Sequence, residues 1–272
     1  MSPLAIHRAD GPEPPVLGRL GGLVARLAGD SADIERAQAL RHAVFVEEGG
    51  ARREGRECGL EADALDAACD HLLIEEPGSG RIVGTYRLLR QDVARAVGRF
   101  YSDGEFDVSA LVARHPERRF LELGRSCVAG GWRDRRTIEL LWQGIWAYAL
   151  EHGCDVMMGC ASLHGTDPHA HSDAFAFLHD HAAAPTEWRA EPRPAAETVR
   201  PADHAPFAGS PRAALAALPP LVKGYLRLGG RIGPEAVVDR DFNCIDVFVT
   251  LPREAIAARY LRHYRADASR FV

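Results

Sequence analysis

The chain has 272 residues, 46% of them hydrophobic and 26% charged, which suffices for one large core or two small ones. Its net charge of −5 argues against non-specific binding of nucleic acid, so we expect no nucleic-acid partner. The sequence has no signal peptide and no apolar run near 18 residues, so we expect a cytoplasmic protein. Peripheral contact with the inner face of the cytoplasmic membrane stays open.

The periodicity predicts strands and helices that alternate along the chain. We expect a loose, proline-rich tail at 1–17, a single domain at 18–265 and an irregular insertion at 185–218. The predicted strands lie at 22–29, 71–76, 81–89, 120–128 and 155–163, with two closing strands in "AVVDR" and "CIDVFVTL". The predicted helices lie at 32–48, 136–153, 172–182, 219–230 and 252–264, with a charged loop at 51–69 and a short amphipathic stretch at 107–114.

This order of elements predicts a mixed α/β sheet with helices on both faces. The six cysteines form no C-x-x-C pair, and most lie in apolar runs, which is typical of reduced, buried thiols. No G-x-G-x-x-G follows the first predicted strand, so a Rossmann dinucleotide site is not expected.

The strand "FLELGRSCV" carries two charges where a core strand should be apolar. Burying an unpaired charge costs several kcal/mol, and Glu122 and Arg125 would point to opposite faces of a regular strand. Glycine within a strand is typical of a β-bulge, so we expect the strand to be bulged near Gly124. The alternative is a plain ion pair of Glu122 with Arg125 at the edge of the sheet.

Further charged residues lie where the pattern predicts core or the ends of elements. Arg41 follows Leu40 on the first helix, Asp66 and Asp70 close the charged loop, and Arg87 is inside the second hairpin strand. Each alone is typical of a solvated surface. Together with Glu122 and Arg125 they favour a polar pocket.

The segment "GGWRDRR" joins this strand to the longest predicted helix. Glycines and the arginines Arg133, Arg135 and Arg136 at a helix N-terminus favour anion binding, because free N–H groups and the helix dipole both attract phosphate. The alternative is a solvated turn.

The sequence gives little support to two other candidate sites. His169 and His171, with Asp167 or Asp173, could bind zinc, but no helical pair or thiolate supports them, so we expect no metal. Cys127 could carry an acyl group, but a buried structural thiol explains it better.

The strand order, the glycine in the fourth predicted strand and the following anion segment resemble the fold of GCN5-related N-acyltransferases. The phrases "LRHAVFVEEGG", "DALDAACDHLLI", "IVGTYRLL", "FYSDGEFDVSAL", "LELGRSCV", "LLWQGIWAYA" and "LPPLVKGYLRLGGRIGPEAVVDRDFNCIDVFV" resemble, more narrowly, bacterial L-ornithine Nα-acyltransferases. The resemblance covers about residues 16–264. The same polar pattern is also similar to acyl-homoserine-lactone synthases.

The resemblance implies an activity. These enzymes move a 3-hydroxyacyl chain from acyl carrier protein to L-ornithine and give lyso-ornithine lipid. In this fold the fourth strand is bulged and splays from the fifth, and the thioester lies in the gap. Glu122 would then remove the proton of the α-amine, and backbone N–H groups near the bulge would polarise the thioester carbonyl. Tyr225, in the pattern Y-x-x-x-G, would protonate the leaving sulfur, unless it only packs in the core.

The resemblance also implies binding roles. Arg41, Phe45, Asp66, Asp70, Arg87 and Arg125 would bind the substrate. An aspartate would hold the side-chain ammonium of ornithine, and Arg41 or Arg87 would hold its carboxylate.

The donor is expected to be acyl carrier protein, docked on Arg133, Arg135 and Arg136, with no bound cofactor. The pyrophosphate signature R-x-x-G-x-G/A of the superfamily lacks both glycines between Arg133 and Ile138, which argues against coenzyme A. Two alternatives stay open. One is a coenzyme-A-dependent acetyltransferase or lactone synthase on the same scaffold, and the other is a non-catalytic acyl-binding module.

Overall fold

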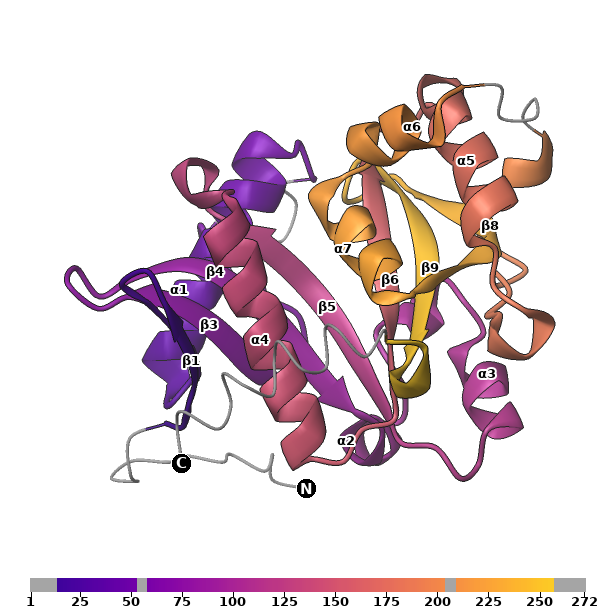
Figure 1. Cartoon of the computed structure of the whole chain (residues 1–272). Coiled ribbons are helices and arrows are strands. Elements are labelled where there is room, and N and C mark those ends of the chain that lie inside the picture. The colour runs from indigo at the N-terminus through magenta and orange to yellow at the C-terminus, as the bar shows by residue number, and fades with distance from the viewer. Residues whose placement is uncertain (1–13, 53–57, 204–208, 257–272) are drawn as a thin grey trace.

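The computed structural model describes residues 14–52, 58–203 and 209–256. Within these ranges the chain forms a nine-stranded sheet with the order β1-β2-β3-β4-β5-β6-β9-β8-β7 (Figure 1). The strands are β1 Val16–Leu20, β2 Leu23–Leu27, β3 Asp70–Glu76, β4 Arg81–Arg90, β5 Phe120–Val128, β6 Val156–His164, β7 Thr198–Val199, β8 Arg231–Asp239 and β9 Cys244–Pro252. Neighbouring strands are antiparallel except β5 and β6, so the sheet is mixed, as predicted.

Helices cover both faces of this sheet. They are α1 Ser31–Arg41, α2 Gln91–Val97, α3 Val108–Arg114, α4 Arg135–Glu151, α5 Ser172–Ala182, α6 Pro211–Ala217 and α7 Pro220–Leu228, and a π-helical segment, η1 His42–Glu48, continues α1. Figure 1 shows α4 in front of β1 to β4 and α1 behind β3 to β5, while α7 lies against β6 and β9. None of the helices in the described ranges is long and apolar enough to cross a membrane.

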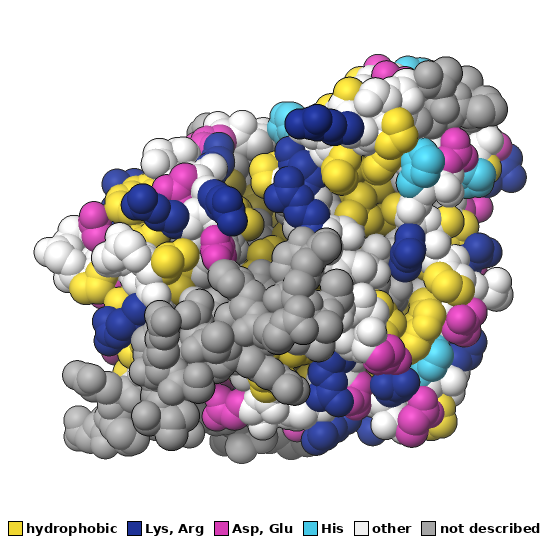
Figure 2. Space-filling model, in the orientation of Figure 1, with side chains coloured by type: hydrophobic (Ala, Val, Ile, Leu, Met, Phe, Trp, Pro, Cys, Tyr) yellow, Lys and Arg dark blue, Asp and Glu magenta, His cyan; other side chains and the backbone are white. Residues whose placement is uncertain are grey.

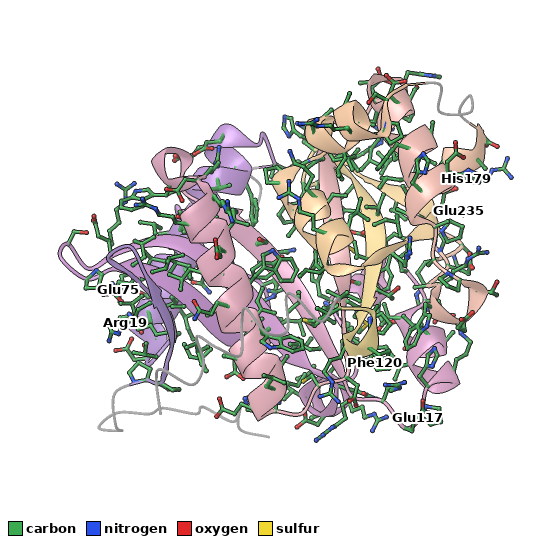
Figure 3. All side chains as sticks on the ribbon, in the orientation of Figure 1. Arg19, Glu75, Glu117, Phe120, His179 and Glu235 are labelled. Atoms are coloured by element: carbon green, nitrogen blue, oxygen red, sulfur yellow. The ribbon has the colours of Figure 1, made fainter. Side chains whose placement is uncertain are left out.

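The long helix α4 packs closely because its apolar residues recur every three to four positions. Leu141, Ile145 and Tyr148 are buried against the sheet. Gly144 permits the approach, since a Cβ there would lie 2.8 Å from the Leu72 Cδ1 atom. Side chains fill the space between α4 and the sheet, and Phe120 marks the start of β5 (Figure 3).

The sheet opens between β5 and β6. These strands pair only at their starts, where Phe120, Leu121 and Glu122 face Val156, Met157 and Met158. Beyond this point they diverge into the V visible in Figure 1, whereas β6 stays paired with β9 along its whole length. Gly159 sits at the point of divergence with φ +154, and a Cβ there would lie 2.3 Å from the Leu123 carbonyl oxygen. Only glycine fits this position.

The predicted bulge near Gly124 is confirmed. Thr85 faces Cys127 and Arg87 faces Gly124, so two residues of β5, Arg125 and Ser126, oppose one residue of β4. Arg125 takes up the extra length with φ 51, an unusual value for a non-glycine residue. Because of the extra residue, the side chains that follow the bulge alternate between the two faces of the sheet out of phase with Glu122.

The sequence prediction and the structure differ at several elements. The expected tail at 1–17 overlaps β1, which pairs with β2 through a two-residue turn at Gly21 and Gly22, both with positive φ. Helix α2 has no predicted counterpart, and the insertion 185–218 contains β7 and α6. Of the final predicted helix, 252–264, only a single 3₁₀ turn, Arg253–Ala255, lies within the described residues.

Candidate active site

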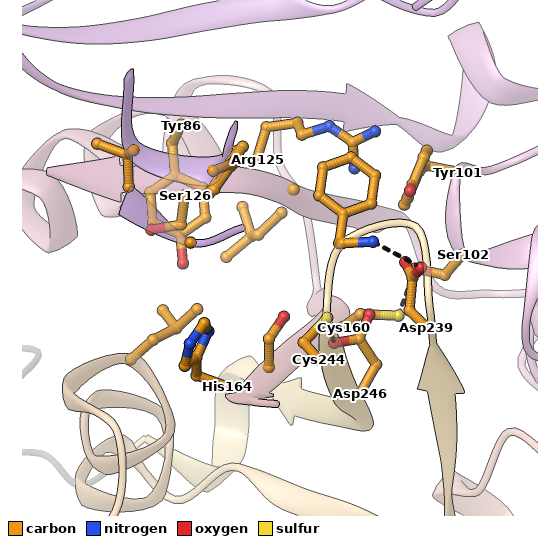
Figure 4. A pocket seen from close by; sticks show the side chains of 18 of the residues that line it. Tyr86, Tyr101, Ser102, Arg125, Ser126, Cys160, His164, Asp239, Cys244 and Asp246 are labelled. Atoms are coloured by element: carbon orange, nitrogen blue, oxygen red, sulfur yellow. Dashed lines mark hydrogen bonds between the residues drawn. The ribbon is translucent and has the colours of Figure 1, made fainter. Parts of the chain in front are cut away.

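A cavity of about 310 Å³ lies where β5 and β6 separate (Figure 4). Its walls come from η1, the segment after α2, the bulge of β5, the outer half of β6 and the turn between β8 and β9. Of the residues predicted to form a site, Phe45, Glu122 and Arg125 line it. The cavity therefore brings together residues that are far apart in the sequence, at the place where β5 and β6 separate.

Glu122 is a buried carboxylate without a charged partner among the described residues. Its side chain is 2% exposed and accepts the backbone N–H groups of Tyr101 (N–Oε2 2.7 Å) and Ser102 (N–Oε1 2.8 Å). Burial raises the pKa of Glu122, and the hydrogen bonds from Ser102 and Tyr101 oppose part of that rise. A fixed carboxylate with a raised pKa is suited to accept a proton near neutral pH.

Arg125 does not pair with Glu122. Its guanidinium binds Glu61 (Nε–Oε1 3.1 Å) and Asp63 (Nη2–Oδ2 3.2 Å). It also lies between two rings, 4.2 Å from the centre of Tyr101 and 4.5 Å from that of Phe242. The alternative of an ion pair between Glu122 and Arg125 is therefore wrong, because the bulge directs the two charges to different partners.

Arg125 belongs to an ion-pair network, which comprises Arg41, Arg87, Arg125, Glu61, Asp63 and Asp66. Arg41 is fully buried and binds Asp66 through two nitrogens, at 2.9 and 2.6 Å. Arg87 Nη1 lies 2.9 Å from Asp66 Oδ1 and 2.7 Å from Asp63 Oδ1. Burial opposes the ionised form of Asp66, but Arg41 and Arg87 hold its pKa well below the usual range. Three arginines and three carboxylates balance one another.

Asp70 lies away from this network and from the cavity. Its carboxylate accepts the Tyr148 hydroxyl and lies 3.5 Å from Arg90 Nη1. Asp66 does not line the cavity either. The structure therefore does not bring Asp66 and Asp70 together. The sequence prediction failed here because residues four apart at the end of a loop need not share a pocket.

A second group of carboxylates, which the sequence analysis missed, lies at the cavity. We call Glu105, Asp239 and Asp246 the acidic cluster. Asp239 and Asp246 line the cavity, and Glu105 reaches Asp246 beside Cys160, with one ligand atom of each within 4.8 Å of the others. Burial and then Asp246 and Asp239 raise the pKa of Glu105 to about 9, and burial also raises the pKa of Asp246. Asp246 in "CIDVFVTL" is a charge in an apolar strand, the same signal that drew attention to Glu122.

In the part of the chain that the structure describes, only this cluster has residues spaced closely enough to hold a metal ion. Glu105 with Cys160 and Asp246, and Asp239 with Cys244 and Asp246, have a suitable spacing. The histidine segment has no such spacing: the His171 ring bonds to the His164 carbonyl, and Asp167 caps the following 3₁₀ turn.

Burial disfavours the thiolate form of the cysteines near the site. Burial raises the pKa of Cys127 to about 12, and burial followed by Glu105 and Asp246 raises that of Cys160 well above its ordinary value. A nucleophilic cysteine needs the opposite shift. Cys127 is therefore better explained as a buried structural thiol, as the sequence suggested.

Two tyrosines lie next to the cavity. Tyr225 is fully buried and packs edge-on against Trp142, with the ring centres 5.0 Å apart, and it does not line the cavity. Tyr86 does line it, on the strand opposite the bulge. The two hydroxyls are close enough to influence each other's pKa, and burial raises the pKa of Tyr86 to about 12. Tyr86 was not predicted, because it alternates normally in its strand.

The predicted anion segment leads into α4 on the front face. Asp134 caps the helix and accepts the Thr137 N–H at 2.9 Å, so this donor is not free for phosphate. Arg133 pairs with Glu48, Arg135 has 93% of its side chain exposed, and Arg136 is exposed. Figure 2 shows several Lys and Arg side chains close together on the upper part of this face.

The sequence matches the family model described as an acetyltransferase (GNAT) domain over residues 40–143. With its mixed sheet, splayed strands and bulge, the chain is an acyltransferase of the GNAT class. It is 51% identical to the L-ornithine N(alpha)-acyltransferase of Rhizobium meliloti (strain 1021), over 96% of this chain and 90% of that protein. It is 50% identical to the L-ornithine N(alpha)-acyltransferase of Agrobacterium fabrum, over 94% and 89%. The chain belongs to the L-ornithine N(alpha)-acyltransferase family.

Among solved structures, FeeM, an N-acyl amino acid synthase from uncultured soil microbes, is similar with a TM-score of 0.43 and 11% identity, covering 90% of this chain and 94% of that one. A coenzyme-A-dependent acyl-homoserine lactone synthase, BjaI, is similar with a TM-score of 0.42 and 18% identity, covering 88% and 83%.

Proposed function

We propose that the protein transfers a 3-hydroxyacyl chain from acyl carrier protein to the α-amine of L-ornithine, giving lyso-ornithine lipid. The observation that carries this proposal is the 51% identity, over nearly the whole chain, to a protein named for acylating ornithine at that nitrogen. The cavity supports it, because it lies at the divergence of β5 and β6 and contains a carboxylate suited to proton transfer.

Glu122 is proposed as the general base. The α-amine of ornithine is mostly protonated at pH 7, and only the neutral amine can attack a thioester. Glu122 would take this proton directly or through water. Its raised pKa makes it a stronger base, which suits it to accept a proton near neutral pH. The amine nitrogen then bonds to the carbonyl carbon, the carbon–sulfur bond breaks, and backbone N–H groups near the bulge would stabilise the oxyanion.

The leaving sulfur needs a proton or must depart as a thiolate. Tyr225 is proposed to supply the proton. Because Tyr86 lines the cavity and Tyr225 does not, the proton from Tyr225 would pass through the Tyr86 hydroxyl. The raised pKa of both phenols favours their protonated forms but also makes each a weaker acid, so we expect only a modest contribution to the rate.

The donor is proposed to approach the front face. Arg133, Arg135 and Arg136 offer positive charge at the start of α4, and acyl carrier protein is acidic. Because Asp134 caps the helix and the glycines of the signature are missing, few backbone N–H groups are free to bind a pyrophosphate. A phosphopantetheine arm presents a single phosphate, which side-chain guanidinium groups can hold.

The test is an assay with purified protein, 3-hydroxyacyl-acyl carrier protein and a panel that includes ornithine, lysine and neutral amino acids, read by mass spectrometry. We expect an Nα-acyl-ornithine product with the carrier-bound donor and little with the matching acyl-coenzyme A. Equal turnover of both donors would contradict carrier dependence. Absence of acylated product with every acceptor would contradict the proposed function.

A further inference from the structure

The acidic cluster has no ion-pair partner among the described residues, and Arg125, which pairs with Glu61 and Asp63, lowers the pKa of Glu105 and Asp246 only in part. Among the described residues, no arginine, lysine or histidine forms an ion pair with Glu105, Asp239 or Asp246. Asp246 is 5% exposed, and its hydrogen-bond donors are neutral: the Cys244 thiol (Sγ–Oδ1 3.3 Å) and the Ser162 hydroxyl. Isolated buried carboxylates are costly unless something neutralises them.

The cluster also faces open space. Asp239 and Asp246 line the cavity, with Arg125 on the opposite side in Figure 4. The Tyr86 hydroxyl in the same cavity is buried, with the residue 2% exposed, and its polar neighbours, the Ser126 and Tyr225 hydroxyls, leave it without a well-formed hydrogen bond in the described part of the chain. An unsatisfied hydroxyl and carboxyl groups without an ion-pair partner around one cavity indicate a ligand that brings polar groups and a positive charge.

Resting on the proposed function, we propose that the acidic cluster binds the side-chain ammonium of ornithine and so sets the acceptor specificity. Asp239 and Asp246 make the contacts from the cavity wall, and Glu105 lies next to Asp246 outside the cavity lining. Glu122 lines the same cavity and serves the α-amine. Ornithine thus offers one nitrogen to the base and its second nitrogen to the cluster.

An ammonium suits this cluster better than a metal ion does. It donates up to three hydrogen bonds, which carboxylate oxygens accept without a fixed coordination geometry. A zinc ion would have to displace the proton of the Cys160 or Cys244 thiol, whereas an ammonium requires no change at either thiol. Binding a cation also stabilises the ionised carboxylates that burial disfavours.

Such a site discriminates strongly against an acceptor without the second amine. Norvaline has the carbon skeleton of ornithine but lacks this amine, so it would leave the carboxylates unpaired. Sites built around a buried polar contact reject analogues that lack it by up to about 10⁴-fold, whereas a single methylene changes selectivity by about 10- to 200-fold. We therefore expect norvaline to be rejected more strongly than lysine.

The test compares kcat/KM for ornithine and norvaline in the wild type, Asp246→Asn and Asp239→Asn. We expect the wild type to prefer ornithine by at least about 100-fold. Either variant should reduce this preference at least about tenfold, mainly through a higher KM for ornithine, and change norvaline turnover by less than about threefold. Asp241→Asn is the matched control: Asp241 lies on the same turn, is exposed and pairs with Arg52, so its preference should not change.

The outcomes separate this inference from the proposed function. If the wild type acylates ornithine but both cluster variants lose ornithine and norvaline turnover equally, the specificity role is wrong. If a chelator abolishes wild-type turnover of both acceptors and added metal restores it, a metal occupies the cluster instead. A wild type that acylates no amino acid at all contradicts the proposed function itself. Asp239→Asn keeps the comparison available if Asp246→Asn does not fold, because Asp239 is only partly buried.

Discussion

The protein buries two groups of charged side chains, which differ in whether they contain partners of opposite charge. In the ion-pair network, each guanidinium of Arg41, Arg87 and Arg125 has a carboxylate within 3.2 Å. In the acidic cluster, no described cation pairs with Glu105, Asp239 or Asp246, and two of these residues face a cavity. The first group neutralises itself and holds elements together. We expect a bound cation to neutralise the second group.

The pKa shifts in the two groups run in opposite directions. The arginines hold the pKa of Asp66 far below its usual range, whereas burial and mutual repulsion raise the pKa of Glu105 to about 9. Glu122 resembles the second group, since its carboxylate has neutral hydrogen-bond donors and a raised pKa. Charge balance, rather than burial alone, therefore separates residues expected to stabilise the fold from residues expected to act on substrate.

The largest effect is expected at Glu122. Glu122→Gln keeps the size of the side chain but can accept only one of the two backbone N–H groups and cannot accept a proton, so kcat should fall by about two to four decades. In the wild type, kcat/KM should rise with pH as the carboxylate, whose pKa is raised, loses its proton. Steady-state kinetics between pH 6 and 9 measures both. A loss below about threefold across this range, with unchanged circular dichroism, would assign the base elsewhere.

Breaking the ion-pair network should affect stability instead. Asp66→Asn removes the partner shared by Arg41 and Arg87 and should lower the free energy of unfolding by about 3–5 kcal/mol. Because the folded pKa of Asp66 is depressed, its contribution is present above its unfolded pKa near 3.8 and is lost as pH falls below it.

Urea denaturation measures this loss. Asp70→Asn is the control, since Asp70 is partly exposed and lies outside the network, and it should cost less than about 1 kcal/mol. A stable Asp66→Asn variant with a raised KM for ornithine would contradict this assignment, because it would show that the ion-pair network binds the acceptor and does not stabilise the fold.

The tyrosines should have a smaller effect on rate. Tyr225→Phe removes only the hydroxyl, so loss of a catalytic acid predicts about a tenfold lower kcat with nearly unchanged stability. Tyr86→Phe should show a similar loss if the proton passes through its hydroxyl. Single-turnover assays with the carrier-bound donor measure both. Full activity of Tyr225→Phe would leave this residue as packing against Trp142.

The acidic cluster should also affect the pH dependence of stability. The folded pKa of Glu105 is raised from 4.5 to about 9, so its contribution is fully present below pH 4.5 and is lost as pH rises towards 9. Thermal unfolding of the empty enzyme should therefore shift downwards over this window, and Glu105→Gln should flatten the slope. An identical slope in the variant would show that Glu105 ionises normally.

The sequence allowed the bulge to be predicted because strand parity is a local property: Glu122 and Arg125 could not share a face without an extra residue. The same reasoning applied to Asp246 in "CIDVFVTL" would have found the acidic cluster. The partners of the arginines were beyond prediction, since Glu61 and Asp63 come from a charged loop without periodicity. Asp70 shows the reverse case, in which closeness in sequence to Asp66 did not mean closeness in space.

We expect the acidic cluster to bind the acceptor and the ion-pair network not to bind it. Isothermal titration calorimetry of ornithine against the wild type, Asp246→Asn and Asp66→Asn, at a temperature where all three are folded, tests it most directly. We expect at least about tenfold weaker binding for Asp246→Asn, which loses a charged contact, and a change below about threefold for Asp66→Asn. Equal weakening in both variants, or weakening only in Asp66→Asn, would contradict the account.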